Sequence, residues 1–532
     1  MRRRGRCMRV GLPVTVAVAI AALAVATGAQ PARAAGGHGR NKRPNIVLVM
    51  TDDQAVSQMS AQFMPNVTSL LADQGTRFDH AYLTTPLCCP SRASLETGQY
   101  GHNNGVLRNV YSLLRDKNNV LPVWLRRSGY VTAHIGKFMN LYRRHKPHPL
   151  KPAPGWDQWY TMLWRTETAY YNYDLSVNGK RVHHGRKPRD YSTRVFNRTA
   201  KRLVEKYVPR RHPLYLELDE TAPHPSVHRH HVSACNPVPD PRDEGRFNDV
   251  PLPDPPSFNE SDMSDKPTFM RVMPLLDDTQ IERMTRNYRC GLDALAGVDR
   301  SVGAIYDKIK QLHELGRTVF IYYSDNGVFK GEHRIYGGKL NPYEEADSTP
   351  LIMRVPSRYL GGTAPAAHVT DPVANIDLAP TILKLAHAKP CPARGRCRTM
   401  DGRSILGLIK GRTPAWAPDR PLGIELERTT AKARHAVCRY RGVRVDGQVL
   451  IRYLTAATDP DSNRCVPSKQ WEQYDLTRDP FELHNLCFAG NESNCPTGPS
   501  ETRLRKTLLR VARCSGVSGR DPRPPAGRRY CD

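Results

Sequence analysis

The stretch that decides the fold is NIVLVMTDD, residues 45–53. Its first six residues form a continuous apolar run of strand length, rich in β-branched side chains. Because the run does not alternate with polar residues, it predicts a strand buried on both faces of a parallel sheet. The strand ends in Thr51, Asp52 and Asp53, so two carboxylates are expected at its C-terminal end.

Three later segments repeat this arrangement of an apolar run followed by polar residues. They are residues 129–135 before Gly136-Lys137, residues 213–218 before His224, and residues 318–323 before Ser324-Asp325-Asn326-Gly327. Helical patterns at 64–74, 118–128 and about 279–315 separate them. This alternation predicts an α/β fold with a large, mostly parallel sheet flanked by helices. Ligands bind beyond the carboxyl ends of such strands, so the polar strand ends should converge on one site.

The polar strand ends carry the groups of a cation site. Any one Asp-Asp or Asp-Asn-Gly is typical of a solvated turn. Placed together, Asp52, Asp53, Asp325 and Asn326 offer only oxygen ligands, which favours calcium or magnesium over zinc. Unpaired carboxylates at close range are costly, so a bound cation is expected among them.

Three further polar side chains suit an anionic ligand. They are Lys137, His224 in Ala-Pro-His-Pro, and Lys339 in Gly-Gly-Lys. Singly they resemble ordinary surface residues. Together they would supply positive hydrogen-bond donors for a tetrahedral oxyanion.

The chain divides into four predicted regions. A basic leader, an apolar stretch and an Ala-Arg-Ala cleavage signal predict a secretory signal peptide over residues 1–34, followed by a flexible leader over 35–42. Residues 43–390 are expected to form the catalytic domain, with a long loop over 223–275. Residues 391–532 are expected to form a smaller, disulfide-rich α+β subdomain.

The signal peptide predicts export to a secreted or extracytoplasmic location. A membrane anchor is the alternative for its apolar stretch, but the cleavage signal argues against a permanent helix, and no stable anchor is expected. The net charge is +28, and loss of the signal peptide's six arginines lowers it to about +22. Such charge favours polyanionic partners, but no nucleic-acid-binding motif accompanies it, so no nucleic acid partner is predicted.

The chain has 13 cysteines, which fits an oxidising compartment. Eight of them crowd the C-terminal region, and we interpret these as disulfides of undetermined connectivity. They are Cys391, Cys397, Cys438, Cys465, Cys487, Cys495, Cys514 and Cys531. Cys235 and Cys290 could supply one more bridge. A zinc site is the competing interpretation, but this region contains no C-x-x-C pair.

The adjacent cysteines of LCCPSRASLETG, residues 87–98, need a different explanation. Neighbouring cysteines are too close in the chain for an unstrained mutual disulfide. Pro90 and Ser91 can begin a helix, whose N-terminus would stabilise an anionic nucleophile at Cys88. A thiol nucleophile and a structural cysteine are the alternatives.

The segment Cys88-Cys89-Pro90-Ser91-Arg92, followed by Thr97-Gly98, resembles the C-x-P-S-R-x(4)-T-G signature of type I sulfatases, in the alkaline phosphatase superfamily. The ordered segments Asp52-Asp53, Gly136-Lys137, Pro223-His224, Ser324-Asp325-Asn326-Gly327 and Gly338-Lys339 are similar to that family too. The resemblance spans about residues 43 to 488. Its motifs look most like those of N-acetylglucosamine-6-sulfatases and extracellular heparan endosulfatases.

The resemblance implies hydrolysis of sulfate esters, on a sulfated sugar such as N-acetylglucosamine 6-sulfate or on an aryl sulfate. It implies that a formylglycine-generating enzyme converts Cys88 to formylglycine (3-oxoalanine), whose hydrate attacks sulfur beside a divalent cation. The implied metal ligands are Asp52, Asp53, Asp325, Asn326 and the modified residue 88. Arg92 would hold the hydrate, Lys137 and Lys339 the sulfate, and His224 would protonate or polarise the leaving oxygen.

One residue departs from the family pattern. Many members carry a histidine shortly after Gly-Lys that helps deprotonate the hydrate, whereas Phe138, Met139 and Asn140 follow Lys137 here. An asparagine cannot act as a base at neutral pH. His333, or less favourably His134, is the predicted substitute.

Two other functions remain compatible with these residues. A phosphonate or phosphate ester hydrolase of the same superfamily would use a similar oxyanion site. A non-catalytic secreted protein that binds polyanions would explain the basic charge alone.

Overall fold

The computed structural model describes residues 43–142, 150–226, 235–428, 437–457 and 464–532. The predicted signal peptide and leader lie outside these described residues. Residues 41–532 form one compact unit, to which both the fold and the site belong. The predicted domain boundary at residue 390 therefore stays a prediction.

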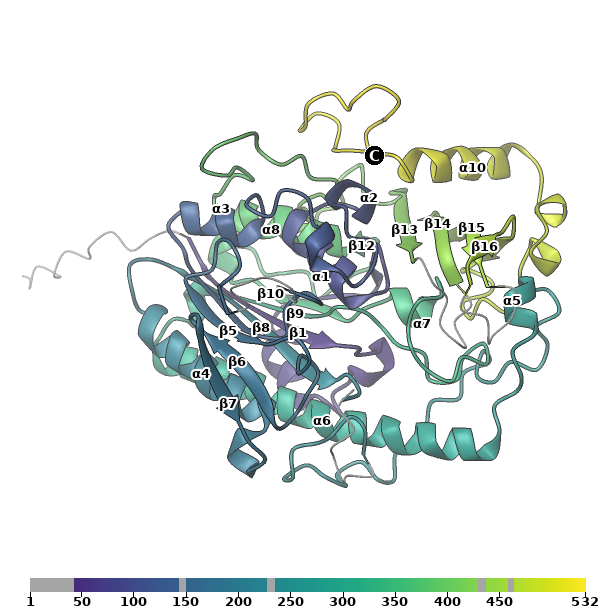
Figure 1. Cartoon of the computed structure of the whole chain (residues 1–532). Helices are drawn as coiled ribbons and strands as arrows, with labels where there is room; N and C mark the ends of the chain where they lie inside the picture. Colours follow the sequence, from purple (N-terminus) through teal and green to yellow (C-terminus); the bar gives the residue numbers. More distant parts are fainter. Residues whose placement is uncertain (1–42, 143–149, 227–234, 429–436, 458–463) are drawn as a thin grey trace, which may run out of the picture. The chain divides into compact units, whose positions relative to one another are not determined.

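A ten-stranded sheet forms the centre of the unit, in the order β11-β2-β10-β9-β1-β8-β4-β5-β6-β7 (Figure 1). Strands β9, β1, β8, β4 and β5 are parallel neighbours, and β10, β6 and β7 add antiparallel pairs. The predicted α/β class with a mostly parallel centre is confirmed. The strands are β1 (Asn45–Asp52), β2 (Thr76–Phe78), β4 (Val131–Gly136), β5 (Gln158–Met162), β6 (Tyr173–Val177), β7 (Lys180–His184), β8 (Leu214–Pro223), β9 (Thr318–Ser324), β10 (Leu351–Arg354) and β11 (His368–Val369).

The sequence of β1 explains its central place. Its alternate side chains enter two separate cores, with Ile46 and Leu48 in one and Val47 and Val49 in the other, and all are at most 1% exposed. A strand covered on both faces needs apolar residues at every position, which is why the run does not alternate.

Helices cover both faces of this sheet (Figure 1). Helices α1 (Cys88–Thr97), α3 (Leu121–Arg127) and α8 (Leu378–Leu385) share the core of Ile46, whereas α4 (Ser192–Tyr207) and α6 (Asp278–Gln311) share the core of Val47. Asp277 caps α6 by accepting a hydrogen bond of 2.8 Å from Gln280 N. The predicted helix at 64–74 is shorter than expected, a π-helical segment over Val67–Ala72.

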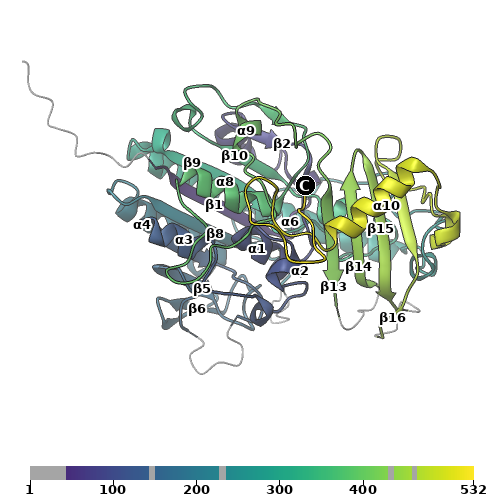
Figure 2. The same cartoon turned by 90° about the horizontal axis from the view of Figure 1, so that it is seen from above.

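A second sheet, in the order β13-β14-β15-β16 with β17 also paired to β15, follows in the C-terminal region. Helix α10 (Pro499–Val511) packs along β13, β14 and β15 (Figure 2). This sheet matches the predicted smaller α+β region. Its strands are β13 (Leu422–Glu427), β14 (Val437–Val445), β15 (Gln448–Ala456), β16 (Val466–Pro467) and β17 (Trp471–Asp475).

The C-terminal cysteines pair as disulfides, which confirms the prediction and excludes a zinc role for them. The pairs are Cys391–Cys397, Cys438–Cys465, Cys487–Cys495 and Cys514–Cys531. Cys235–Cys290 ties the predicted long loop to α6, whereas Cys88 and Cys89 are buried free thiols.

The remaining elements are short. They are β3 (Ala81–Tyr82), paired with β12 (Val373–Ala374), and the helices α2 (Gly101–Asn104), α5 (Thr268–Arg271), α7 (Glu344–Asp347) and α9 (Leu406–Ile409). Within the described part of residues 224–277, α5 is the one helix, so the predicted long loop is confirmed.

Candidate active site

The ends of four parallel strands bring the predicted polar residues together. Thr51 of β1 pairs with Ser324 of β9, so Asp52 and Asp53 lie beside Asp325 and Asn326. Strand β4 ends immediately before Lys137, and β8 ends immediately before His224. Ligand atoms of Asp52, Asp53, Cys88 and His224 all lie within 4.8 Å of one another.

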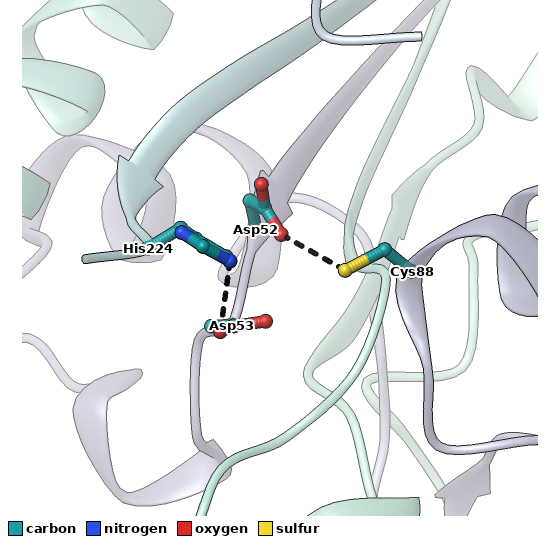
Figure 3. Close-up of side chains that lie close together, drawn as sticks. All are labelled: Asp52, Asp53, Cys88 and His224. Carbon is teal, nitrogen blue, oxygen red and sulfur yellow. Dashed lines mark hydrogen bonds and ion pairs between the residues drawn. The ribbon is translucent and has the colours of Figure 1, made fainter. Parts of the chain in front are cut away.

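Cys88 is the first residue of α1, and Leu87, in an extended conformation, occupies the N-cap position without a side-chain capping hydrogen bond. The Cys88 Sγ lies 3.6 Å from Asp52 Oδ1 and 2.8 Å from Lys339 Nζ. Figure 3 shows Cys88 and His224 on opposite sides of Asp52. A group at position 88 therefore faces the positive end of the helix dipole as well as the acidic cluster.

Arg92 lies one helical turn after Cys88 and connects two strand ends. Its Nε donates to Asp325 Oδ2 at 2.9 Å, and its Nη1 donates to Asp219 Oδ2 at 2.8 Å. The same Nη1 donates to the Lys137 carbonyl at 2.6 Å. Because all three acceptors are buried, Arg92 is fixed in the floor of the site rather than exposed to solvent.

Two buried lysines neutralise the two aspartates at the end of β1, Asp52 and Asp53. Lys137 forms an ion pair with Asp52, and Lys339 forms one with Asp53. Burial by itself would raise the pKa of Asp52, but the nearby positive charges, Lys137 foremost, together outweigh it and the pKa is lowered. Asp52 therefore stays ionised at neutral pH even though it is fully buried.

The acidic cluster fits a hard divalent cation. Asn326 Nδ2 donates to Asp53 Oδ1 at 2.7 Å, which leaves Asn326 Oδ1 buried and without a partner among the described residues. Burial, then the neighbouring Asp52, raises the pKa of Asp325 to about 6. Three carboxylates and one amide oxygen form the ligand set that calcium or magnesium prefers. Repulsion among the three carboxylates also favours the binding of a cation between them.

The two adjacent cysteines have different surroundings. Burial raises the pKa of Cys88 to about 12, so its sulfur is a neutral thiol. Cys89 N donates to Asn109 Oδ1 at 3.0 Å, and its side chain packs in the core shared with Ile46 and Trp124. Cys88 therefore lies in the polar site, whereas Cys89 lies in the apolar core.

A cavity of about 670 Å³ opens onto this cluster. Cys88, His224 and Lys339 line it, together with Asn140. The remaining lining residues come from five segments of the described chain, and they are Leu87, Arg108, Asn109, Trp164, Arg165, Glu167, Thr168, Gly338, Leu340 and Arg428. The cavity is large enough for a sugar ring, and it presents arginines from the segments after α2, β5 and β13.

Sequence reasoning missed Asp219, which joins Arg92 to a buried histidine. His134 Nε2 lies 3.2 Å from Asp219 Oδ2, and His134 Nδ1 lies 2.6 Å from Thr161 Oγ1. Burial raises the pKa of Asp219 to about 8. Asp219 directly follows the apolar run 213–218, as Asp52 follows its own run, so the same signal could have found it.

Neither substitute base predicted for the missing histidine lines the described part of this cavity. His134 is enclosed by Trp156, Trp159 and Phe138. His333 is fully buried, and its Nδ1 lies 2.7 Å from Glu260 Oε2. The structure brings the other predicted site residues together but does not bring these two to Cys88.

Comparison with known proteins identifies the fold family. The family profile described as Sulfatase matches residues 44–388. The chain belongs to the sulfatase family. A second profile, N-sulphoglucosamine sulphohydrolase, C-terminal, matches residues 331–502, across the junction with the second sheet. Members of this family use a formylglycine and a divalent metal.

Curated relatives of this sulfatase carry several names. It is 33% identical over 397 residues to an extracellular sulfatase SULF-1 homolog of Drosophila melanogaster, covering 71% of this chain and 32% of the relative. It is 27% identical to an N-acetylglucosamine-6-sulfatase of Capra hircus, covering 91% and 86%. The chain spans only a third to a half of the length of the Drosophila and Caenorhabditis elegans relatives it matches.

Solved structures share the fold of this sulfatase. One, in complex with its substrate D-glucosamine-2-N,6-O-disulfate, has a TM-score of 0.68 and 24% identity, covering 88% of this chain and 97% of that chain. A phosphonate monoester hydrolase from Silicibacter pomeroyi has a TM-score of 0.64 and 19% identity, covering 88% and 95%. Among the described residues, none of the helices combines the length and apolar character needed to cross a bilayer.

Proposed function

We propose that this protein hydrolyses sulfate esters, with residue 88 as the formylglycine-derived nucleophile and a divalent cation beside it. The observation that carries the proposal is the position of Cys88, at the N-terminus of α1 between Asp52 and Lys339. A nucleophile, an acidic cation site and a lysine thus meet at the floor of one cavity.

The cation would be held by Asp52, Asp53, Asp325 and Asn326, with calcium as the proposed ion and magnesium as the alternative. The modified residue would supply the attacking oxygen. The cation, when bound, would neutralise charge on that oxygen and on the sulfate. Arg92 would orient residue 88, which lies one turn earlier in the same helix. Its ion pairs with Asp219 and Asp325 fix the position of its guanidinium group.

The surrounding side chains would bind the sulfate and move a proton. Lys339 lines the cavity beside residue 88 and can donate a hydrogen bond to a sulfate oxygen. The same role is proposed for Lys137, which is fully buried in its ion pair with Asp52. His224 Nδ1 lies 2.6 Å from the Pro225 carbonyl, and its Nε2 lies 3.6 Å from Asp53 Oδ2. This geometry leaves Nε2 as the atom that would face the leaving oxygen, and it would protonate that oxygen only as the imidazolium, a form that burial disfavours by lowering the pKa of His224. The catalytic role predicted for His333 stays a prediction.

The proposed substrate is a sulfated sugar such as N-acetylglucosamine 6-sulfate. The size of the cavity, its arginines and the names of several relatives support it. A secreted or extracytoplasmic location, after cleavage of the signal peptide, is proposed from the leader and is supported by relatives named extracellular sulfatases. A formylglycine-generating enzyme in the producing cell would be the partner in biosynthesis.

The test combines mass spectrometry with kinetics. We expect the peptide carrying residue 88 to have the mass of formylglycine in active enzyme, and expect release of sulfate from N-acetylglucosamine 6-sulfate. Active enzyme with an unmodified cysteine at position 88 would refute the mechanism.

Phosphonate or phosphate ester hydrolysis is the second candidate, because phosphonate monoester hydrolases share this fold. Parallel kinetics on 4-nitrophenyl sulfate, 4-nitrophenyl phosphate and a phosphonate monoester separate the two functions. A higher kcat/KM on either phosphorus ester than on the sulfate would favour the second candidate.

A further inference from the structure

A second group of potential metal ligands lies outside the Cys88 cavity. His333 and Glu345 stand on either side of Lys339 in the sequence, and Glu482 comes from the segment after β17. One ligand atom from each of the three lies within 4.8 Å of the other two. The group therefore joins the loop that carries Lys339 to the C-terminal region.

Each of the three side chains is fixed by one of its two polar atoms. His333 Nδ1 lies 2.7 Å from Glu260 Oε2, and Glu345 Oε1 accepts a hydrogen bond of 3.2 Å from Ser257 Oγ. Glu482 Oε2 accepts a hydrogen bond of 2.8 Å from the backbone N of residue 344. These bonds orient the side chains before any ligand arrives.

The other polar atom of each side chain is buried and has no hydrogen-bond partner among the described residues. These atoms are His333 Nε2, Glu345 Oε2 and Glu482 Oε1. His333 and Glu482 are 0% and 1% exposed, and His333 Nε2 lies 3.9 Å from Glu345 Oε2. Three unpartnered atoms that face one another are costly unless a ligand binds them all.

The contact with Glu260 sets the chemistry of the histidine. With its proton on Nδ1, donated to the carboxylate, His333 presents a lone pair on Nε2. A carboxylate behind the ring is the usual support of a histidine that binds metal. One imidazole nitrogen and two carboxylate oxygens suit zinc or a similar transition-metal ion better than calcium.

The spacing and access also suit a metal. Donors bound at about 2.1 Å to a tetrahedral ion lie about 3.4 Å apart, so a small rotation of Glu345 brings it and His333 to that separation. Glu345 also lines an open cavity of about 720 Å³, which provides a path for the ion and for a water as fourth ligand.

We propose that His333, Glu345 and Glu482 form a second metal site, which binds Zn²⁺ and is separate from the cation site at Cys88. The ion would crosslink the Lys339 loop to the segment after β17, and it would stabilise the junction of the two sheets. This role does not depend on sulfatase activity.

The test uses the full-length protein, stripped with a chelator and then saturated with Ca²⁺ to fill the acidic cluster of Asp52. Zn²⁺ is titrated by calorimetry, and metal content is measured after desalting. We expect one Zn²⁺ per chain and a higher melting temperature. Crystals soaked in Zn²⁺ should give an anomalous peak between His333, Glu345 and Glu482. Absence of the peak, with no Zn²⁺ retained, would overturn the proposal in favour of a proton shared between the carboxylates.

Glu482→Gln keeps an acceptor oxygen for the backbone N of residue 344 but removes the charge. It should weaken Zn²⁺ binding at least about 100-fold. Glu332→Gln is the matched control, since Glu332 is buried and lines the same cavity but is not one of the three ligands. Equal Zn²⁺ affinity in the two variants would also overturn the proposal.

Discussion

The Cys88 cluster holds buried charges together by ion pairs, whereas the β13–β17 sheet and its flanking segments are crosslinked by disulfides. In the cluster, Lys137, Lys339 and Arg92 face buried aspartates from the strand ends. The C-terminal region instead carries four disulfides. Buried ion pairs cost desolvation energy and add little net stability, but they fix geometry. Disulfides stabilise the fold, but they do not fix the positions of reactive side chains.

The comparison predicts that substitutions in the Cys88 cluster change activity, and that substitutions in the C-terminal region change stability. Both regions belong to one compact unit, so the distinction concerns what each contributes rather than whether they fold separately. The predictions below run from the largest expected effect to the smallest.

The first prediction concerns the two adjacent cysteines. Cys88→Ala should lower kcat/KM on an aryl sulfate by at least about 10⁴-fold, because the nucleophile is lost. Cys89→Ala is the matched control, and it should retain activity within about tenfold because its side chain packs in the core. Equal losses of kcat/KM in the two variants would contradict the assignment of Cys88, rather than Cys89, as the precursor of the nucleophile.

The second prediction concerns the cation. Removal of divalent metal with EDTA should lower kcat by about 10³-fold or more, and Ca²⁺ or Mg²⁺ should restore it. Asp325→Asn should remain inactive after Ca²⁺ is added, since it loses both a ligand charge and the ion pair with Arg92. Asp174→Asn, at an exposed ion pair on β6, should behave as the wild type. Full turnover in EDTA would contradict a metal-dependent reaction.

The third prediction concerns the C-terminal disulfides. Replacing Cys438 and Cys465 with Ala opens a loop of 27 residues, which should lower the free energy of unfolding by about 3.5 kcal/mol. Urea denaturation measures this loss. At a temperature where the variant is folded, kcat/KM should stay within twofold of the wild type. A tenfold fall in kcat/KM of the folded variant would show that the region contributes directly to catalysis.

The fourth prediction concerns an ion pair between α2 and the C-terminal strand β13. His102 of α2 lies 3.0 Å from Glu425 Oε2 of β13 through Nδ1, and 3.0 Å from the Cys514 carbonyl through Nε2. Both ring nitrogens face acceptors, so the histidine is protonated. Burial opposes this charge, but Glu425, Asp401 and the Cys514 carbonyl together outweigh it and raise the pKa of His102.

The pair makes stability depend on pH. The His102 contribution is full below its unfolded pKa of about 6.5 and is lost as pH rises through the raised folded pKa. The Glu425 contribution is present above about pH 4.5 and is lost as pH falls, since His102 and Arg441 outweigh burial and lower its pKa to about 2. The pair should therefore stabilise the fold most between about pH 4.5 and 6.5.

His102→Gln should lower the free energy of unfolding by about 2 kcal/mol at pH 5.5, and the loss should shrink towards pH 9. Urea denaturation at the two pH values measures the difference. His183→Gln is the control, because the His183–Asp174 pair is largely exposed and should contribute little. A pH-independent loss in His102→Gln would mean that packing, not charge, is responsible.

The sequence predicted much of the fold because its strongest signals are local. The unbroken apolar run before Asp52 requires two covered faces, and that requirement leads to a parallel sheet whose strand ends meet. The acidic strand ends and the CCPSR segment then indicated the site. The predicted helix at 64–74 was less accurate, since Val67–Ala72 is π-helical and its first backbone N donates to Asp299 of α6, a contact between residues far apart in sequence.

Only the tertiary structure decided which polar residues share a site. His333 follows the Asp325 segment closely in the chain, yet it lies against Glu260 rather than in the Cys88 cavity. Arg428 comes from a distant segment and carries no motif of its own, yet it lines the same cavity. Local sequence determines secondary structure and the polarity of each strand end, whereas the meeting of side chains far apart in sequence depends on how the whole chain packs.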